Sequence, residues 1–137
     1  MLGRMNFEFE DSEVAAISLH SGALQIRFSA ARVHDSDRAG AGEGLWQPLL
    51  LICKHIAQTD KAPEADLTPI LAAVGRVRQA QLHIAGQRLR RLPLPFSSDA
   101  GFVLELEVGD GLFCRLKGQG LELQALPGRS SVDSYQC

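Results

Sequence analysis

The sequence lacks most features that mark secreted or membrane-spanning chains. Only 3 of its 137 residues are cysteine, and this odd number at wide spacing does not fit the disulfide framework of a small secreted domain. The longest apolar run, Leu49 to Cys53, is too short to span a bilayer, and the first residues lack the apolar core of a signal peptide. We therefore expect a cytoplasmic protein with free thiols and no membrane partner.

Net charge and aromatic residues are also sparse. The formal net charge is -2 and aromatic residues make up 6% of the chain, so a basic field for a nucleic-acid backbone and a set of rings for base stacking are both missing. Nucleophile elbows, phosphate-binding loops and zinc-ribbon spacings do not occur either. We expect no nucleic-acid partner, no cofactor and no catalytic residue that a motif identifies.

The sequence does contain many turn residues and short alternating segments. Its 13 glycines and 6 prolines favour many short elements. Apolar and polar residues alternate with period two on both sides of Ser21-Gly22, which is typical of half-buried strands. A two-residue turn there predicts a hairpin with two facing apolar pairs, Leu19 with Leu24 and Ile17 with Ile26.

The C-terminal third shows the clearest alternation. Phe102 to Val108 and Leu112 to Lys117 predict an antiparallel hairpin closed by the three residues Gly109-Asp110-Gly111. A three-residue loop sets Leu106 opposite Cys114, whereas a two-residue loop would set it opposite Arg115 and bury a charge. A further two-residue turn at Gln119-Gly120 is predicted to set Leu116 against Leu123.

Helical spacing occurs once, where Leu67, Ile70, Leu71 and Val74 follow Asp66 and precede Gly75; this predicts at most one short helix over 66–75. Pro93 and Pro95 place their segment at a sheet edge. The whole pattern predicts a mainly β fold of about eight to nine strands, an antiparallel sandwich or a partly closed barrel. We expect a single β domain over 1–137 with a polar tail from about residue 128.

Two features favour a protein-binding surface. Basic residues gather in one stretch, while the acidic residues Glu8, Glu10, Asp11 and Glu13 crowd the N-terminus. Trp and Arg dominate the energetics of known interfaces, so we predict that a partner protein, with an acidic surface, binds at Trp46, Arg76, Arg78, Arg88, Arg90 and Arg91. The alternative interpretation of these arginines is a set of solvated strand faces.

A different type of site is indicated beside the Gly-rich stretch Gly40 to Gly44. His34, Asp35 and Asp37 concentrate an imidazole and two carboxylates, which can act as a base with its orienting acid or hold a divalent ion. Turn-forming residues at a solvated strand end explain the same pattern. Cys53 and His55 share one face of a strand and form half of a zinc site, but the other half is not apparent, so we predict no metal.

Ile26-Arg-Phe-Ser-Ala-Ala-Arg-Val33, a Gly-rich loop, an apolar strand, Leu92-Pro-Leu-Pro95 and two terminal hairpins follow one another in the chain. This order resembles a loosely defined group of short, uncharacterised bacterial all-β proteins. Some bacterial proteins of this size are immunity partners that neutralise a toxin domain, which implies an intracellular immunity or accessory role.

The pattern supplies a rigid core and a long loop but no reacting constellation. We therefore predict a non-enzymatic protein-binding module, monomeric or weakly homodimeric. The alternative is a small-ligand-binding barrel or an enzyme that uses His34, Asp35 and Asp37.

Overall fold

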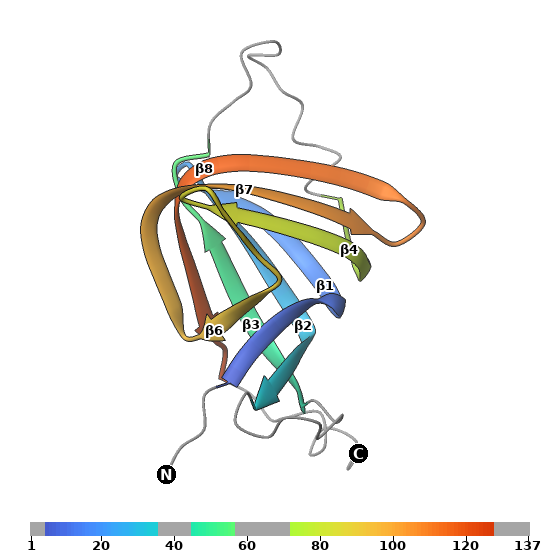
Figure 1. Cartoon of the computed structure of the whole chain (residues 1–137). Helices are drawn as coiled ribbons and strands as arrows, with labels where there is room; N and C mark the ends of the chain where they lie inside the picture. The colour runs from blue at the N-terminus through green and yellow to red at the C-terminus, as the bar shows by residue number, and fades with distance from the viewer. Residues whose placement is uncertain (1–4, 36–44, 57–71, 128–137) are drawn as a thin grey trace.

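The structure is a computed structural model that describes residues 5–35, 45–56 and 72–127. These residues form eight β-strands and no helix (Figure 1). The strands are β1 (Met5–His20), β2 (Ala23–Asp35), β3 (Leu45–Cys53), β4 (Gly75–Ile84), β5 (Gln87–Leu89), β6 (Arg91–Leu94), β7 (Phe96–Val108) and β8 (Leu112–Ala125). The prediction of a mainly β, antiparallel fold is confirmed.

The strands close into a barrel. Hydrogen-bonded neighbours follow the order β5-β4-β7-β8-β3-β2-β1-β6, and Glu13 and Val14 of β1 pair in addition with Arg76 and Gly75 of β4. This pairing closes a ring of six strands, β4, β7, β8, β3, β2 and β1, with β5 and β6 as extra strands. Of the two predicted architectures, the chain adopts the barrel.

Apolar side chains from alternate positions of the strands meet inside the ring as one core cluster. Three aromatic rings lie at its centre: the centroids of Phe7 and Phe9 are 4.7 Å apart, and those of Phe7 and Phe28 are 5.0 Å apart. Edge-to-face and tilted rings at such distances add to the free energy gained by burying their area. The period-two alternation of the sequence therefore becomes the inner and outer surfaces of a barrel.

The locally specified hairpins have the predicted registers. In the β1–β2 hairpin, Ile17 faces Ile26 and Leu19 faces Leu24. In the β7–β8 hairpin, Leu106 faces Cys114 and Leu104 faces Leu116, as the three-residue loop requires. β6 pairs with β1 alone, so the prediction of an edge position for the proline-containing segment is also confirmed.

The predicted turn at Gln119-Gly120 is wrong, because β8 continues through these residues as one strand to Ala125. β8 bends here and passes from β7 alone to pairing with β3 as well, at the upper left of Figure 1. A Cβ atom at Gly118 would lie 2.6 Å from the carbonyl oxygen of Lys54, and Gly120 has a φ of 101°. The glycines thus serve a close strand crossing rather than a hairpin turn.

The predicted helix over 66–75 is not supported at its C-terminal end. Residues 66–71 lie outside the described part of the chain, Ala72 is in a turn, and Gly75 already begins β4 with a φ of 121°. Helical backbone requires a negative φ, so Gly75 belongs to the strand. Within the ranges that the structure describes, there is no helix long and apolar enough to cross a membrane.

Candidate functional site

A break in the pairing of β1 with β2 positions charged side chains on the outer surface. The register shifts between Glu8 and Glu13, and Asp11 lies in the left-handed region with a φ of 74°. Ser12 is fully buried at this break; its hydroxyl donates to the carbonyl oxygen of Glu8 (2.7 Å) and accepts from the backbone N–H of Arg32 (2.8 Å). One side chain thus replaces the backbone hydrogen bonds that the ladder loses.

One row of side chains crosses four strands beside the break. Glu8 of β1 is the register partner of Arg91 of β6 and of Arg32 of β2, and Arg32 is in turn the partner of Trp46 of β3. The row faces outward, since Phe7 and Val33 at adjacent positions are buried in the core. Opposed side chains on one face have Cβ atoms about 4.5–5.5 Å apart. We call Arg91, Glu8, Arg32 and Trp46 the cross-strand row.

Ion pairs connect the middle of the row to its surroundings. The Nε2 atom of His34 lies 2.7 Å from Oε1 of Glu8. Nη1 of Arg32 lies 3.2 Å from Oδ2 of Asp11 and 3.9 Å from Oε1 of Glu8. Asp11 is fixed here by the left-handed backbone at the break. The carboxylate of Glu8 therefore joins an imidazole and a guanidinium on adjacent strand positions.

The predicted alternative site is described only in part. His34 contacts Glu8, which the sequence prediction did not include. Asp35 is the last residue of β2, but its side chain lies outside the described residues, and so does Asp37. The sequence gave no signal for the contact of His34 with Glu8, since the two residues lie on strands whose shared register follows a bulge.

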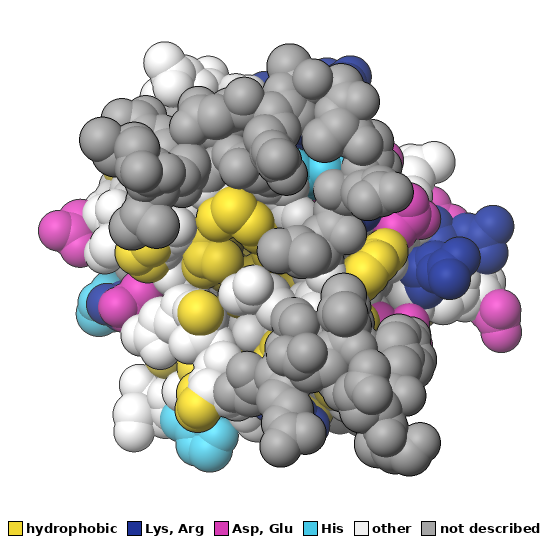
Figure 2. Space-filling model, turned by 90° about the horizontal axis from the view of Figure 1, so that it is seen from below, with side chains coloured by type: hydrophobic (Ala, Val, Ile, Leu, Met, Phe, Trp, Pro, Cys, Tyr) yellow, Lys and Arg dark blue, Asp and Glu magenta, His cyan; other side chains and the backbone are white. Residues whose placement is uncertain are grey.

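Most of the predicted arginines lie beside the acidic residues of β1. Arg76 is the register partner of Glu13, and Arg91 is that of Glu8. Arg88 and Arg90 line a surface hollow of about 270 Å³ together with Glu8, Phe9, Glu10 and Ala80. Figure 2 shows acidic and basic side chains next to one another at the right of that view. The basic stretch and the acidic N-terminal segment, far apart in sequence, form one surface of mixed charge.

Arg78 lies away from these carboxylates. Its Nη1 atom donates to the carbonyl oxygen of Gly109, at 3.5 Å, in the turn between β7 and β8. The structure thus brings Trp46 and Arg91 into one row and places Arg76, Arg88 and Arg90 around β1, but it does not bring Arg78 to the same place.

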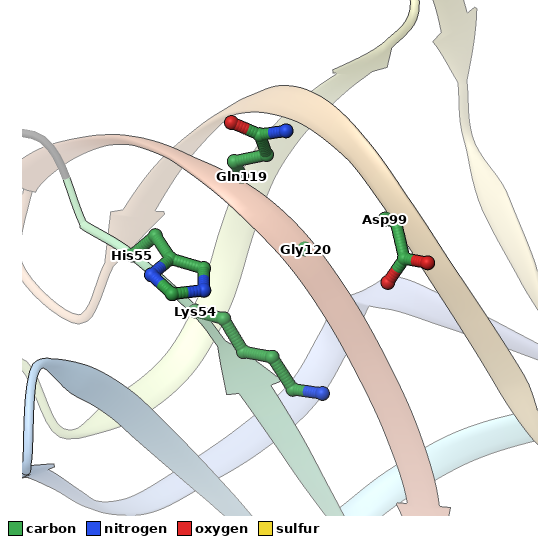
Figure 3. Close-up of a pocket in the computed structure, with 5 residues that line it drawn as sticks. All are labelled: Lys54, His55, Asp99, Gln119 and Gly120. Carbon is green, nitrogen blue, oxygen red and sulfur yellow. The ribbon is translucent and has the colours of Figure 1, made fainter.

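A second hollow of about 510 Å³ lies where β3 ends. Figure 3 shows its lining: Lys54 and His55 after β3, Asp99 of β7, and Gln119 and Gly120 of β8. Nζ of Lys54 lies 3.5 Å from Oε1 of Glu122, and His55 has a left-handed φ of 50°. An ammonium group and a carboxylate on separate walls can hold a polar ligand. Sequence analysis missed this group because three strands supply it.

The half zinc site proposed for Cys53 and His55 is wrong. Cys53 is fully buried, and burial raises the pKa of its thiol to about 12. His55 is exposed and lies beyond the end of β3, where the positive φ has ended the strand alternation. Among the residues with a described position, no group of three or more His, Cys, Asp or Glu side chains is arranged to hold a metal ion.

No protein-family model, curated protein or solved structure matches this chain. The function is therefore inferred from the geometry of the chain itself.

Proposed function

We propose that this protein is a non-enzymatic protein-binding module whose partner contacts the cross-strand row. The observation that carries the proposal is the register that sets Arg91, Glu8, Arg32 and Trp46 side by side on four strands. Arginine and tryptophan are the residues most enriched at the centres of protein interfaces. The row combines them on a continuous outer surface.

The row is also held in place before any partner arrives. Ser12 anchors the backbones of Glu8 and Arg32, and Asp11 and His34 hold the side chains of the same two residues. A surface that is already ordered loses less conformational entropy on binding than one that must be ordered by the partner. This favours recognition by a rigid face.

The barrel interior supports the same assignment. The side chains that point inward from the described strands belong to one apolar core. A small-molecule site is usually a concave apolar cavity in which a few polar groups converge. The polar and charged side chains of this barrel lie on its outer surface instead, where a macromolecule contacts them.

The mixed charge of the face determines the chemistry of the partner. Carboxylates of β1 lie beside Arg76 and Arg91 and share a hollow with Arg88 and Arg90. We therefore propose a partner that presents both acidic and basic side chains, with its acidic groups at the exposed arginines and an apolar group at Trp46. An immunity or accessory role, in which the chain blocks another protein by binding it, is the role we propose for such a module.

Capture followed by quantitative binding tests the proposal. The tagged chain is isolated from its native cells, a stoichiometric protein is identified by mass spectrometry, and its affinity is measured with purified components. Trp46→Ala and Arg91→Ala should each weaken binding by at least about tenfold, which is about 1.4 kcal/mol. Arg27→Ala, an exposed arginine elsewhere on β2, should leave the affinity unchanged. Equal affinity of all four proteins would refute the proposal.

The hollow at the end of β3 favours a second candidate function, the binding of a small polar ligand. Lys54 and Asp99 provide opposite charges on separate walls of this 510 Å³ space. A thermal-shift panel of amino acids, sugars and nucleotides tests this candidate with the wild-type chain and a Lys54→Ala, Asp99→Ala variant. A ligand that stabilises the wild type alone would support it, and a panel without any stabilising compound would count against it.

A further inference from the structure

We propose that β8 carries a second, independent interaction surface: the strand edge from Leu112 to Lys117, to which an acidic extended segment of a partner protein adds as a further strand. This edge lies on the opposite side of β8 from β7, and none of its residues belongs to the cross-strand row. The proposal therefore does not rest on the function proposed above.

The pairing of β8 leaves this edge open within the described residues. β7 covers one side of β8 from Leu112 to Gln119. On the other side β3 pairs only from Leu121 onward, with two further backbone hydrogen bonds between Lys54 and residues Gln119 and Gly120. In the ranges 5–35, 45–56 and 72–127, no strand pairs with the outer side of Leu112 to Lys117.

Hydrogen-bond parity identifies which backbone groups the edge presents. The N–H of Gln119 donates to the carbonyl oxygen of Lys54 (3.0 Å), on the side away from β7. In an antiparallel strand, the N–H and C=O of every second residue point to the same side. The backbone groups of Phe113, Arg115 and Lys117 therefore point to the open edge, whereas those of Cys114 and Leu116 bond to β7. Three donors and three acceptors are available to an added strand.

The side chains of the same three residues decide what kind of strand fits. Phe113, Arg115 and Lys117 are exposed on the outer face, and Phe113 retains 61% of its surface. Cys114 and Leu116 alternate with them and are buried in the core. The open edge thus offers one aromatic ring followed by two cations at every second position.

These charges disfavour a second copy of the chain as the occupant. An antiparallel pair of two such edges centred near Arg115 would bring Arg115 and Lys117 of one copy against the same cations of the other. Like charges directly opposite one another on a sheet are destabilising. A partner strand with acidic residues opposite Arg115 and Lys117 and an aromatic residue opposite Phe113 satisfies all three positions. In the antiparallel direction this partner sequence is Glu-x-Glu-x-Phe.

Amide hydrogen exchange of the full chain, followed by NMR, tests the open edge directly. In the isolated protein, the amides of Phe113, Arg115 and Lys117 should exchange rapidly, while those of Cys114 and Leu116 should be protected. A capped peptide of sequence Thr-Glu-Thr-Glu-Thr-Phe-Thr should slow exchange of the three edge amides by at least about tenfold. The same peptide with Lys in place of Glu should not.

Substitutions at Arg115 separate the backbone contribution from that of the side chain. Arg115→Pro removes an N–H that points to the open edge and so breaks no hydrogen bond to β7. Arg115→Ser removes the same side chain but keeps the N–H. Both variants should fold with similar thermal stability, and the proline variant should bind the acidic peptide at least about tenfold more weakly than the serine variant.

Three outcomes would overturn the proposal. Protection of the three edge amides in the isolated protein would show that the chain covers its own edge. Equal protection by acidic and basic peptides would remove the charge argument, and equal binding by the two Arg115 variants would remove the strand-addition argument. Trp46→Ala should leave peptide binding unchanged, so a failure of this proposal is distinguishable from a failure of the proposed protein-binding face.

Discussion

The hydroxyl oxygen of Ser12 accepts a 2.8 Å hydrogen bond from the backbone N–H of Arg32, on the neighbouring strand. Ser12 is fully buried, and its own proton goes to the carbonyl oxygen of Glu8 at 2.7 Å. A single small polar side chain thus holds together the two residues at the centre of the cross-strand row, at the point where the β1–β2 ladder is interrupted.

Replacing this serine should destabilise the barrel. Ser12→Ala leaves the N–H of Arg32 and the carbonyl oxygen of Glu8 without their partner, and an unsatisfied buried group costs about 1–3 kcal/mol. We expect the free energy of unfolding, measured by urea denaturation, to fall by about this amount. Ser29→Ala, at an exposed position of β2, should change it by less than about 0.5 kcal/mol. An unchanged stability of Ser12→Ala would mean that water replaces the hydroxyl.

Gly118 should not tolerate a side chain. A Cβ atom there would lie 2.6 Å from the carbonyl oxygen of Lys54 and 2.9 Å from the ring of Phe102, so the strands must separate. We expect Gly118→Ala to lower the free energy of unfolding by about 1–3 kcal/mol.

The matched control for this substitution is Gly101→Ala. A Cβ atom at Gly101 would approach only the carbonyl oxygen of Gly118, at an ordinary 3.8 Å. The variant should therefore stay within about 0.5 kcal/mol of the wild type in the same measurement. Similar losses for both glycines would contradict the close crossing of β8 and β3.

Stability should depend on the thiol of Cys53 at alkaline pH. Burial raises the pKa of this thiol from 9.0 to about 12, so between these values the folded chain keeps a proton that the unfolded chain has released. The contribution is fully present below pH 9.0 and is lost as the pH rises toward about 12. Denaturation curves for the wild type and Cys53→Ala should converge over this range, since the variant lacks the group. Parallel curves would argue against a buried, protonated thiol.

The arginines around β1 should serve binding rather than folding. Arg88, Arg90 and Arg91 are all exposed, and exposed charge changes usually alter stability by less than about 0.5 kcal/mol each. Replacing all three with serine should leave the melting temperature nearly unchanged while weakening capture of the partner. A large drop in melting temperature would show that these side chains contribute to folding through their contacts with β1.

The sequence by itself determined the local parts of the fold. Period-two alternation and turn residues between neighbouring segments predicted the β1–β2 pairs and the register of the β7–β8 hairpin, both of which the structure confirms. Such predictions succeed because a slip of one residue would move every apolar side chain to the wrong face. The same alternation predicted Cys114 as a core residue, and it is buried.

Tertiary structure alone decided which strands meet. Barrel closure through Glu13 with Arg76, and the pairing of Arg91 with Glu8, join segments that are far apart in the chain. These pairings merged an apparently separate basic stretch with the acidic segment of β1. The Gln119-Gly120 pair has the composition of a turn, yet close contact with Lys54 made it a strand crossing. Local patterns specify the period and faces of a strand, but the choice among several compatible edges depends on how all strands close around one core.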